Sequence, residues 1–134
     1  MFTLFTDGGS RGNPGNSACA YFLLDSEGKL SDFGGEFLGT VTNNNAEYSG
    51  LINGLKLAVK NGIDDLLVCM DSELAIKQIT GIYKVSSDSI KEQHKEVKYL
   101  EKNFKKIEFK HVPREQNKFA DKLVNTILDT IESK

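Results

Sequence analysis

The hydrophobic periodicity of this 134-residue chain changes once, and that change limits the folds it can adopt. Before residue 42, apolar residues fall in three strand-length stretches, at residues 2–6, 18–24 and 30–38, separated by glycine-containing turns. After residue 42, they recur at helical spacing, first at Tyr48, Leu51, Ile52, Leu55, Ala58 and Val59. Three consecutive strands with short connections predict an antiparallel meander, which the later helices must cover.

The second part of the chain alternates predicted helices with single strands. Helices are expected at residues 44–61, 72–80, 89–104 and 117–132, and strands at 65–70 and 107–112. Right-handed crossovers would place the first, fourth and fifth strands parallel. The order βββαβααβα therefore predicts one α/β domain over residues 1–134, a three-layer structure whose mixed five-stranded sheet carries helices on both faces.

Charge is spread unevenly along the chain. The formal net charge is −2, which argues against a strongly cationic nucleic-acid coat protein or a membrane-surface binder. Residues 84–122 nevertheless hold eleven Lys and Arg against seven Asp and Glu. This basic segment is either a solvated helix face or a patch that contacts phosphates.

The cysteines and the apolar stretches indicate where such a chain works. Cys19 and Cys69 are fifty residues apart, each within an apolar segment, so we expect two buried reduced thiols. No apolar stretch approaches the ~20 residues of a membrane span, and the N-terminus has no signal-peptide pattern. We therefore expect a cytoplasmic protein with no membrane association. No segment indicates an obligate protein partner, so we expect a monomer.

Four carboxylates occupy positions that stability alone rarely favours. Asp7 is expected to end the first strand and Asp71 the fourth, and neighbouring parallel strands would bring both to one edge of the sheet. Glu47 lies one turn before Leu51 and leans toward the buried face of its helix. Asp121 lies among Ala120, Val124 and Leu128, so it also leans inward.

Each carboxylate also has an ordinary structural alternative. Asn44 and Glu47 form a capping-box pattern, Asp71 could cap the next helix, Asp7 could be a turn residue, and Asp121 could lie on the surface. Four inward carboxylates together would repel one another unless cations neutralise them. Oxygen ligands of this kind favour Mg²⁺ or Mn²⁺ over zinc.

Two polar segments flank these carboxylates. Residues 8–16 contain four glycines but match neither a Walker loop nor a dinucleotide-binding motif, so they predict a long hairpin loop. Its bare backbone, with Ser10 and Asn13, is either a loop with no ligand or suited to lying against a sugar-phosphate chain. Residues 42–45 crowd short polar side chains at a helix start, where one cap suffices and the other side chains remain available to a ligand.

Four segments form an ordered set that spans nearly the whole chain: residues 6–15 (TDGGSRGNPG), 42–47 (TNNNAE), 70–72 (MDS) and 111–121 (HVPREQNKFAD). This set resembles the successive motifs of the ribonuclease H type 1 family. The resemblance implies a ribonuclease-H-like fold and a hydrolase, an endoribonuclease that cuts the RNA strand of RNA/DNA hybrids with two Mg²⁺ or Mn²⁺ ions. It also implies products with 5′-phosphate and 3′-hydroxyl ends.

The same resemblance assigns roles to individual residues. It gives Asp7, Glu47, Asp71 and Asp121 as the catalytic metal ligands. It gives contacts to the hybrid, including those that read the RNA 2′-hydroxyls, to a second set: Asn13, Asn43 and Asn44, supported by Ser10 and Gly12, with Thr42 seating a DNA-strand phosphate.

Two departures from the family pattern limit this assignment. Better-known members carry a mobile histidine on a long loop before the last aspartate, whereas His111 has that offset but is expected to end a strand. Arg114, nearer Asp121, is therefore the preferred partner for the scissile phosphate or the departing product. The chain also lacks tryptophan and the basic handle of many members, with only residues 82–88 in its place. The alternative function is a non-catalytic ribonuclease-H-like module that binds nucleic acid, although a complete set of four carboxylates argues against it.

Overall fold

The sheet begins with the three-strand meander that the sequence predicts. In the computed structural model, which describes residues 1–134, the first three strands pair in antiparallel order: β1 (Phe2–Gly12), β2 (Gly15–Leu24) and β3 (Leu30–Val41). The chain continues through α1 (Asn43–Lys60), β4 (Asp65–Met70), α2 (Glu73–Ile79), α3 (Asp88–Glu101), β5 (Lys106–His111), the 3₁₀ turn η1 (Arg114–Gln116) and α4 (Lys118–Glu132). This order confirms the predicted βββαβααβα arrangement.

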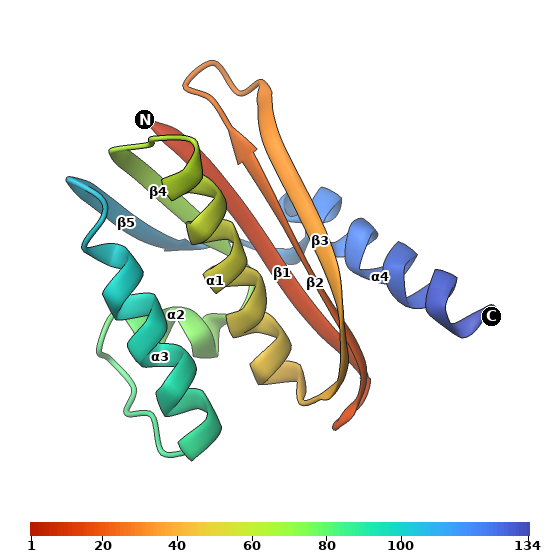
Figure 1. The fold of residues 1–134 in the computed structure, drawn as a ribbon. Helices are drawn as coiled ribbons and strands as arrows, with labels where there is room; N and C mark the ends of the chain where they lie inside the picture. The colour runs from red at the N-terminus through yellow and green to blue at the C-terminus, as the bar shows by residue number, and fades with distance from the viewer.

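The five strands form one mixed sheet in the order β3-β2-β1-β4-β5. β4 pairs in parallel with both β1 and β5, as the crossover argument predicts. Figure 1 shows α1 and α3 side by side in front of the sheet and α4 behind it. The three-layer α/β architecture with helices on both faces is therefore confirmed.

The glycine-rich segment at residues 8–16 is not the long hairpin loop that its composition predicts. β1 and β2 stay paired as far as Gly12 and Gly15, so the turn consists of Asn13 and Pro14 alone. Glycine is a weak strand former, but pairing with β2 on one side overrides that preference here. As a consequence, Asp7 lies within β1 and not at its end, although the pairing of β1 with β4 does stop just before it.

The starts of two helices exclude two of the structural alternatives. Thr42 caps α1, and its Oγ1 accepts a hydrogen bond from the Asn45 N–H at 3.2 Å, so Asn44 and Glu47 do not form a capping box. Ser72 caps α2 by accepting from the Ala75 N–H at 3.2 Å. Neither Glu47 nor Asp71 therefore acts as a helix cap.

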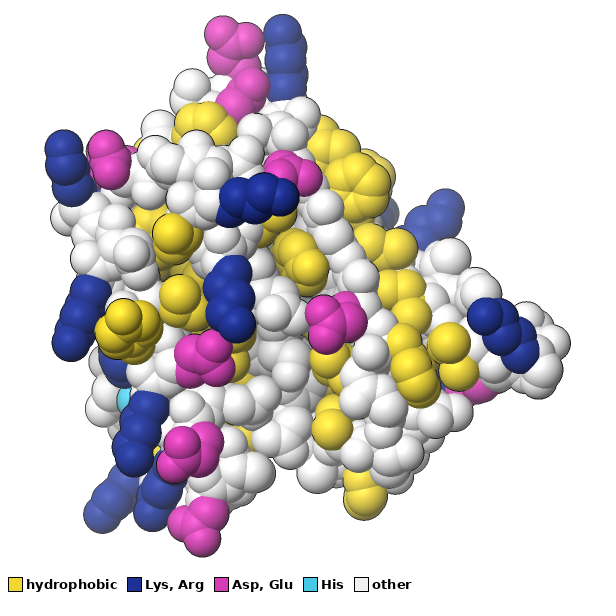
Figure 2. Space-filling view, viewed as in Figure 1, with side chains coloured by type: hydrophobic (Ala, Val, Ile, Leu, Met, Phe, Trp, Pro, Cys, Tyr) yellow, Lys and Arg dark blue, Asp and Glu magenta, His cyan; other side chains and the backbone are white.

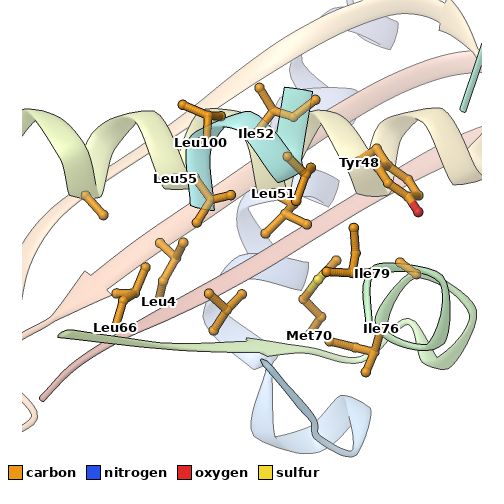
Figure 3. Close-up of a cluster of buried hydrophobic side chains, with 14 of the residues drawn as sticks. Leu4, Tyr48, Leu51, Ile52, Leu55, Leu66, Met70, Ile76, Ile79 and Leu100 are labelled. Atoms are coloured by element: carbon orange, nitrogen blue, oxygen red, sulfur yellow. The ribbon is translucent and has the colours of Figure 1, made fainter. Parts of the chain in front are cut away.

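Buried apolar side chains form one large and one small cluster on opposite faces of the sheet. The large cluster of 17 buried residues fills the space between the sheet and α1, α2 and α3. Figure 3 shows part of it, with Leu55 and Leu51 of α1 facing Leu4 and Met70 of the sheet. The small cluster of five buried residues joins α4 to β2.

Two further expectations concern cysteines and membranes. Cys19 and Cys69 are both buried and free, as the sequence predicts. No helix combines the length and the apolar character that a membrane span requires.

Candidate active site

The parallel pairing of β1 with β4 brings the first two carboxylates together. The register aligns Thr6 with Met70 at the end of the shared ladder, so Asp7 and Asp71 follow on adjacent strands at the same level. Asp7 is 6% exposed and Asp71 is half-buried. The juxtaposition that the sequence predicts for this pair is confirmed, and Asp7 is not a turn residue.

Glu47 joins this pair because α1 approaches β1 closely at two glycines. A Cβ atom at Gly8 would lie 2.1 Å from the Ala46 carbonyl oxygen, and one at Gly50 would lie 2.6 Å from the Asp7 carbonyl oxygen. Only glycine permits so close an approach of the helix to the strand at these positions. The approach carries Glu47, which is 7% exposed, over the end of the β1–β4 ladder.

Asp7, Glu47 and Asp71 form a compact acidic cluster. One carboxylate oxygen from each lies within 4.8 Å of the others. Burial and repulsion from Asp71 raise the pKa of Asp7 to about 7. Burial, followed by repulsion from Asp7, raises the pKa of Glu47 well above its ordinary value. The Glu47 Oε2 atom is buried without a hydrogen-bond partner.

This cluster has the chemistry of a divalent cation site. Buried carboxylates that repel one another, one of them with an unpartnered oxygen, are costly unless a positive charge compensates them. The donor set is entirely carboxylate oxygen, with no histidine or cysteine among the three residues. Such a set suits hard cations such as Mg²⁺ or Mn²⁺ and disfavours zinc.

Asp121 lies beside this cluster but outside it. It is half-buried on the first turn of α4, as its predicted inward lean indicates, and its Oδ1 lies 3.3 Å from Nη2 of Arg114. Asn117 anchors the start of α4, since its Nδ2 donates to the Thr6 carbonyl oxygen at 2.8 Å and its own carbonyl accepts from the Asp121 N–H at 3.1 Å. These bonds tie Asp121 to the strand that carries Asp7.

All four carboxylates line one cavity of about 410 Å³. Arg114 also lines it, and its hydrogen bond to Asp121 raises the pKa of the guanidinium above its ordinary value. His111 does not line the cavity. It is the exposed last residue of β5, as the sequence predicts, and lies near Glu73. The structure thus brings Arg114, and not His111, to the carboxylates.

Of the residues expected to contact substrate, Ser10 and Asn43 line the cavity, and Gly12, Asn13, Thr42 and Asn44 lie next to them in the chain or bond to them; together they are called the polar rim. Asn43 Oδ1 accepts from the Ser10 N–H at 3.3 Å, and Asn13 Oδ1 accepts from the Asn43 N–H at 3.1 Å. Ser10 Oγ also donates to the Gly12 carbonyl oxygen. The β1–β2 turn is thereby fixed to the start of α1.

Asn44 and Thr42 differ in how far they are engaged. Asn44 is half-buried and makes no side-chain hydrogen bond within the protein. Thr42 Oγ1 both caps α1 and donates to Asn45 Oδ1 at 2.6 Å. Of the two, only Asn44 has a side chain with its full hydrogen-bonding capacity unused.

Sequence reasoning did not identify three polar residues of this region. Arg11 and Asn125 line the cavity, although they are 114 residues apart, and they contact each other. Asn117 is buried and holds the last helix in place. An asparagine directly before the amphipathic pattern of α4 was the available signal for Asn117, whereas no local pattern links Arg11 to Asn125.

Comparisons with known proteins agree with this geometry. Residues 5–127 match the protein family described as reverse transcriptase-like. Ribonuclease HI of Halobacterium salinarum is 38% identical over 125 residues, which cover 93% of this chain and 63% of that protein. The crystal structure of ribonuclease H1 from the same organism has a TM-score of 0.94 at 36% identity, covering 96% of this chain and 98% of that one. This chain belongs to the ribonuclease H type 1 family.

A further member of the ribonuclease H family was solved with nucleic acid. LC11-RNase H1 in complex with an RNA/DNA hybrid has a TM-score of 0.93 at 34% identity, covering 98% of this chain and 99% of that one. In contrast, the chain spans 63% of the length of the curated Halobacterium relative and 34% of that of three mycobacterial relatives.

Only residues 80–87 join α2 to α3, so the structure has no basic handle at this place, and the chain contains no tryptophan. Three lysines of α3, at positions 91, 95 and 98, lie within 4.0 Å of acidic side chains of the same helix. Figure 2 shows Lys and Arg side chains over α3 at the left of the view, with Asp and Glu among them. Much of the basic segment is therefore a solvated face with internal ion pairs.

Proposed function

We propose that this chain is a metal-dependent endoribonuclease that cuts the RNA strand of RNA/DNA hybrids. The observation that carries the proposal is the cluster of Asp7, Glu47 and Asp71, with carboxylate oxygens within 4.8 Å and a buried unpartnered Glu47 oxygen. Membership of the ribonuclease H family and the hybrid-bound LC11-RNase H1 structure, similar over 98% of this chain, support the choice of substrate.

The site suits two Mg²⁺ or Mn²⁺ ions held by the cluster together with Asp121. Bound there, a pair of divalent ions would activate a water and stabilise the leaving 3′ oxygen of an in-line displacement, leaving a 5′-phosphate on the other product. The protein contributes the fixed positions of its ligands: Asp7 and Asp71 through the strand ladder, and Glu47 through the glycine contacts.

The polar rim accounts for the preference for RNA. In this proposal, Asn13, Asn43 and Asn44, with the backbone at Ser10 and Gly12, face the minor groove of the hybrid, where 2′-hydroxyls distinguish RNA from DNA. The Asn44 amide is free to donate and to accept, as contact with a hydroxyl requires. Thr42, at the start of α1, would help to seat a phosphate of the DNA strand.

Arg114 completes the site from the other side. Its side chain is 76% exposed and contacts Asp121, so it can reach a phosphate at the mouth of the cavity. A guanidinium at that position would bind the scissile phosphate or the departing product. We assign this role to Arg114 in preference to His111, which lies outside the cavity.

Affinity for the hybrid should be modest and sensitive to salt. The lysines that form no ion pair within the protein, among them Lys110, Lys118 and Lys122, are the available phosphate contacts of the basic segment. Because the chain lacks the basic handle, we propose that it grips the hybrid weakly. We also propose that it works as a monomer, since no segment indicates an obligate protein partner.

A labelled-substrate assay tests the proposed function. The purified chain should cut the RNA strand of a hybrid only when Mg²⁺ or Mn²⁺ is present and should leave the same RNA uncut as a single strand. Tight hybrid binding with no cleavage in either metal would instead support the non-catalytic binding module.

A further inference from the structure

A polar stripe runs along α4 away from the active site. Its residues recur every three or four positions and so share one face of the helix: Asp121, Asn125, Asp129 and Glu132. Arg11, near the end of β1, lies against this stripe. Its Nη1 lies 2.7 Å from Asp129 Oδ1 and 2.8 Å from Glu132 Oε2, and its Nη2 donates to Asn125 Oδ1 at 3.1 Å. Two carboxylates and an amide oxygen thus hold the guanidinium.

These contacts set the orientation of the Asn125 amide. Its Oδ1 accepts from Arg11, so its Nδ2 faces Asp121, where it donates to the backbone carbonyl at 3.0 Å and lies 3.5 Å from Oδ1. A guanidinium only donates and a carboxylate only accepts. A flipped amide would face donor to donor at Arg11 and acceptor to acceptor at Asp121. Arg11 therefore selects the orientation in which Asn125 offers an N–H to Asp121.

Asn117 fixes the backbone of Asp121, but few other contacts restrain its carboxylate. Asp121 lies outside the three-carboxylate cluster, on a helix that contributes three residues to the small buried cluster. Its other partner, Arg114, is 76% exposed and faces the mouth of the cavity. Asn125 is half-buried, and Arg11 holds its amide on the side away from Asp121. Asn125 is therefore held more firmly than Arg114.

We propose that Arg11 and Asn125 are positioning residues that hold the Asp121 carboxylate for metal binding. The proposal rests on the proposed function in one respect, namely that Asp121 is a metal ligand. Neither residue needs to touch the metal or the nucleic acid, because both act through Asp121. Partners of metal ligands commonly alter metal affinity or activity by about 10–100-fold when they are removed.

A calorimetric titration of the full chain with Mn²⁺, in the absence of nucleic acid, tests this proposal. Asn125→Ala should weaken Mn²⁺ binding about tenfold. Arg11→Lys keeps the charge but cannot hold both carboxylates and the amide, so it should weaken binding in the same direction. Thr126→Ala, which removes an exposed hydroxyl that bonds only to the Lys122 carbonyl, is the matched control on α4 and should bind as the unsubstituted chain does.

The decisive comparison is with Asp121→Asn. If Asn125 acts through the Asp121 carboxylate, adding Asn125→Ala to Asp121→Asn should weaken Mn²⁺ binding no further. Equal weakening by Asn125→Ala with and without that carboxylate would overturn the positioning role, as would unchanged binding in folded Asn125→Ala protein. Coupling to Asp121 would support the role even in a protein that leaves hybrids uncut, so the test is separate from that of the proposed function.

Discussion

The two faces of the sheet are built differently. On the face covered by α1, α2 and α3, 17 buried apolar residues form a continuous core, and the large side chains of Leu4, Tyr48, Leu51 and Leu55 are fully enclosed. On the other face, α4 is joined to the sheet by five buried residues, three of which are alanines: Ala18, Ala20, Ala120, Val124 and Leu128. Polar contacts at Asn117, Asn125 and Arg11 supplement this smaller cluster.

Because of this difference, one side of the active site is held rigidly by packing and the other side can adjust. Glu47 is fixed by the large core and by close backbone contact, so its carboxylate stays buried despite the electrostatic cost. Asp121 and Arg114 belong to the lightly packed side and are positioned by hydrogen bonds. Substitutions on the two sides should therefore differ in how they divide between stability and cleavage.

The largest expected effects are on the cleavage rate, and they arise from substitutions on both faces of the sheet. Glu47→Gln and Asp121→Asn should each lower the cleavage rate about 10³-fold, because loss of a metal ligand removes several kcal/mol of transition-state stabilisation. The free energies of unfolding in urea, measured on the metal-free proteins, should differ between the two variants. Glu47→Gln should stabilise the chain by relieving a buried charge, whereas Asp121→Asn should change stability by no more than about 0.5 kcal/mol. A reversed order of the two stabilities would contradict the contrast between the faces.

The pH dependence of stability should report the buried cluster. The pKa of Asp7 is raised from 3.8 to about 7, so the metal-free fold binds a proton that the unfolded chain has already released. The free energy of unfolding should then be highest below pH ~4 and fall as the pH rises through ~7, by about 4 kcal/mol at most. Asp7→Asn should flatten this fall, as measured by urea unfolding in a chelator at several pH values. An unchanged slope in that variant would show that other groups cause it.

The same substitution on each face compares the two clusters directly. Leu55 and Leu128 are both buried, at 0% and 2% exposure. Leu55→Ala should cost about 3 kcal/mol because the surrounding core is large and closed, and Leu128→Ala about 2 kcal/mol because the small cluster can relax. Denaturant midpoints with unchanged slopes measure both values, and a larger cost at Leu128 would refute the comparison.

The smallest expected effects distinguish two side chains near the lightly packed side. Arg114→Ala should lower kcat about tenfold, since an exposed charge-assisted contact to phosphate is lost. His111→Ala should change kcat by less than about twofold, because the ring lies outside the cavity. Steady-state cleavage of a labelled hybrid gives both ratios. A larger loss in His111→Ala than in Arg114→Ala would reverse their assigned roles.

Much of the fold could be predicted because local patterns set it. The three- and four-residue steps from Tyr48 to Leu51 and Leu55 mark α1. The compact apolar run before Asp71 marks β4 with the bounds that the structure shows. The continuation of β1 through residues 8–12 could not be seen, because pairing with β2 overrides the low strand preference of glycine. The length of a strand through such residues is decided by tertiary contact.

The carboxylates of the site could be predicted for a similar reason. Asp7 and Asp71 lie just beyond the last residues that β1 and β4 pair in parallel, a pairing that topology implies, and the helical phase places Glu47 inward. The partners of Asp121 could not be predicted. Arg11 lies on β1 and Asn125 on α4, and only the packing of that helix beneath the sheet brings them to 3.1 Å. Polar contacts between distant segments leave no periodic signal in the sequence.

The most direct test compares the chain with its Asp71→Asn variant on an end-labelled RNA/DNA hybrid in Mg²⁺ and in Mn²⁺. Asp71 belongs to the three-carboxylate cluster that defines the site. If that cluster is the metal centre, the unsubstituted chain should cut the RNA strand to give 5′-phosphate and 3′-hydroxyl ends, and the folded variant should be at least about 10³-fold slower. Cleavage that survives in Asp71→Asn, or cleavage of single-stranded RNA with the hybrid left intact, would contradict this account.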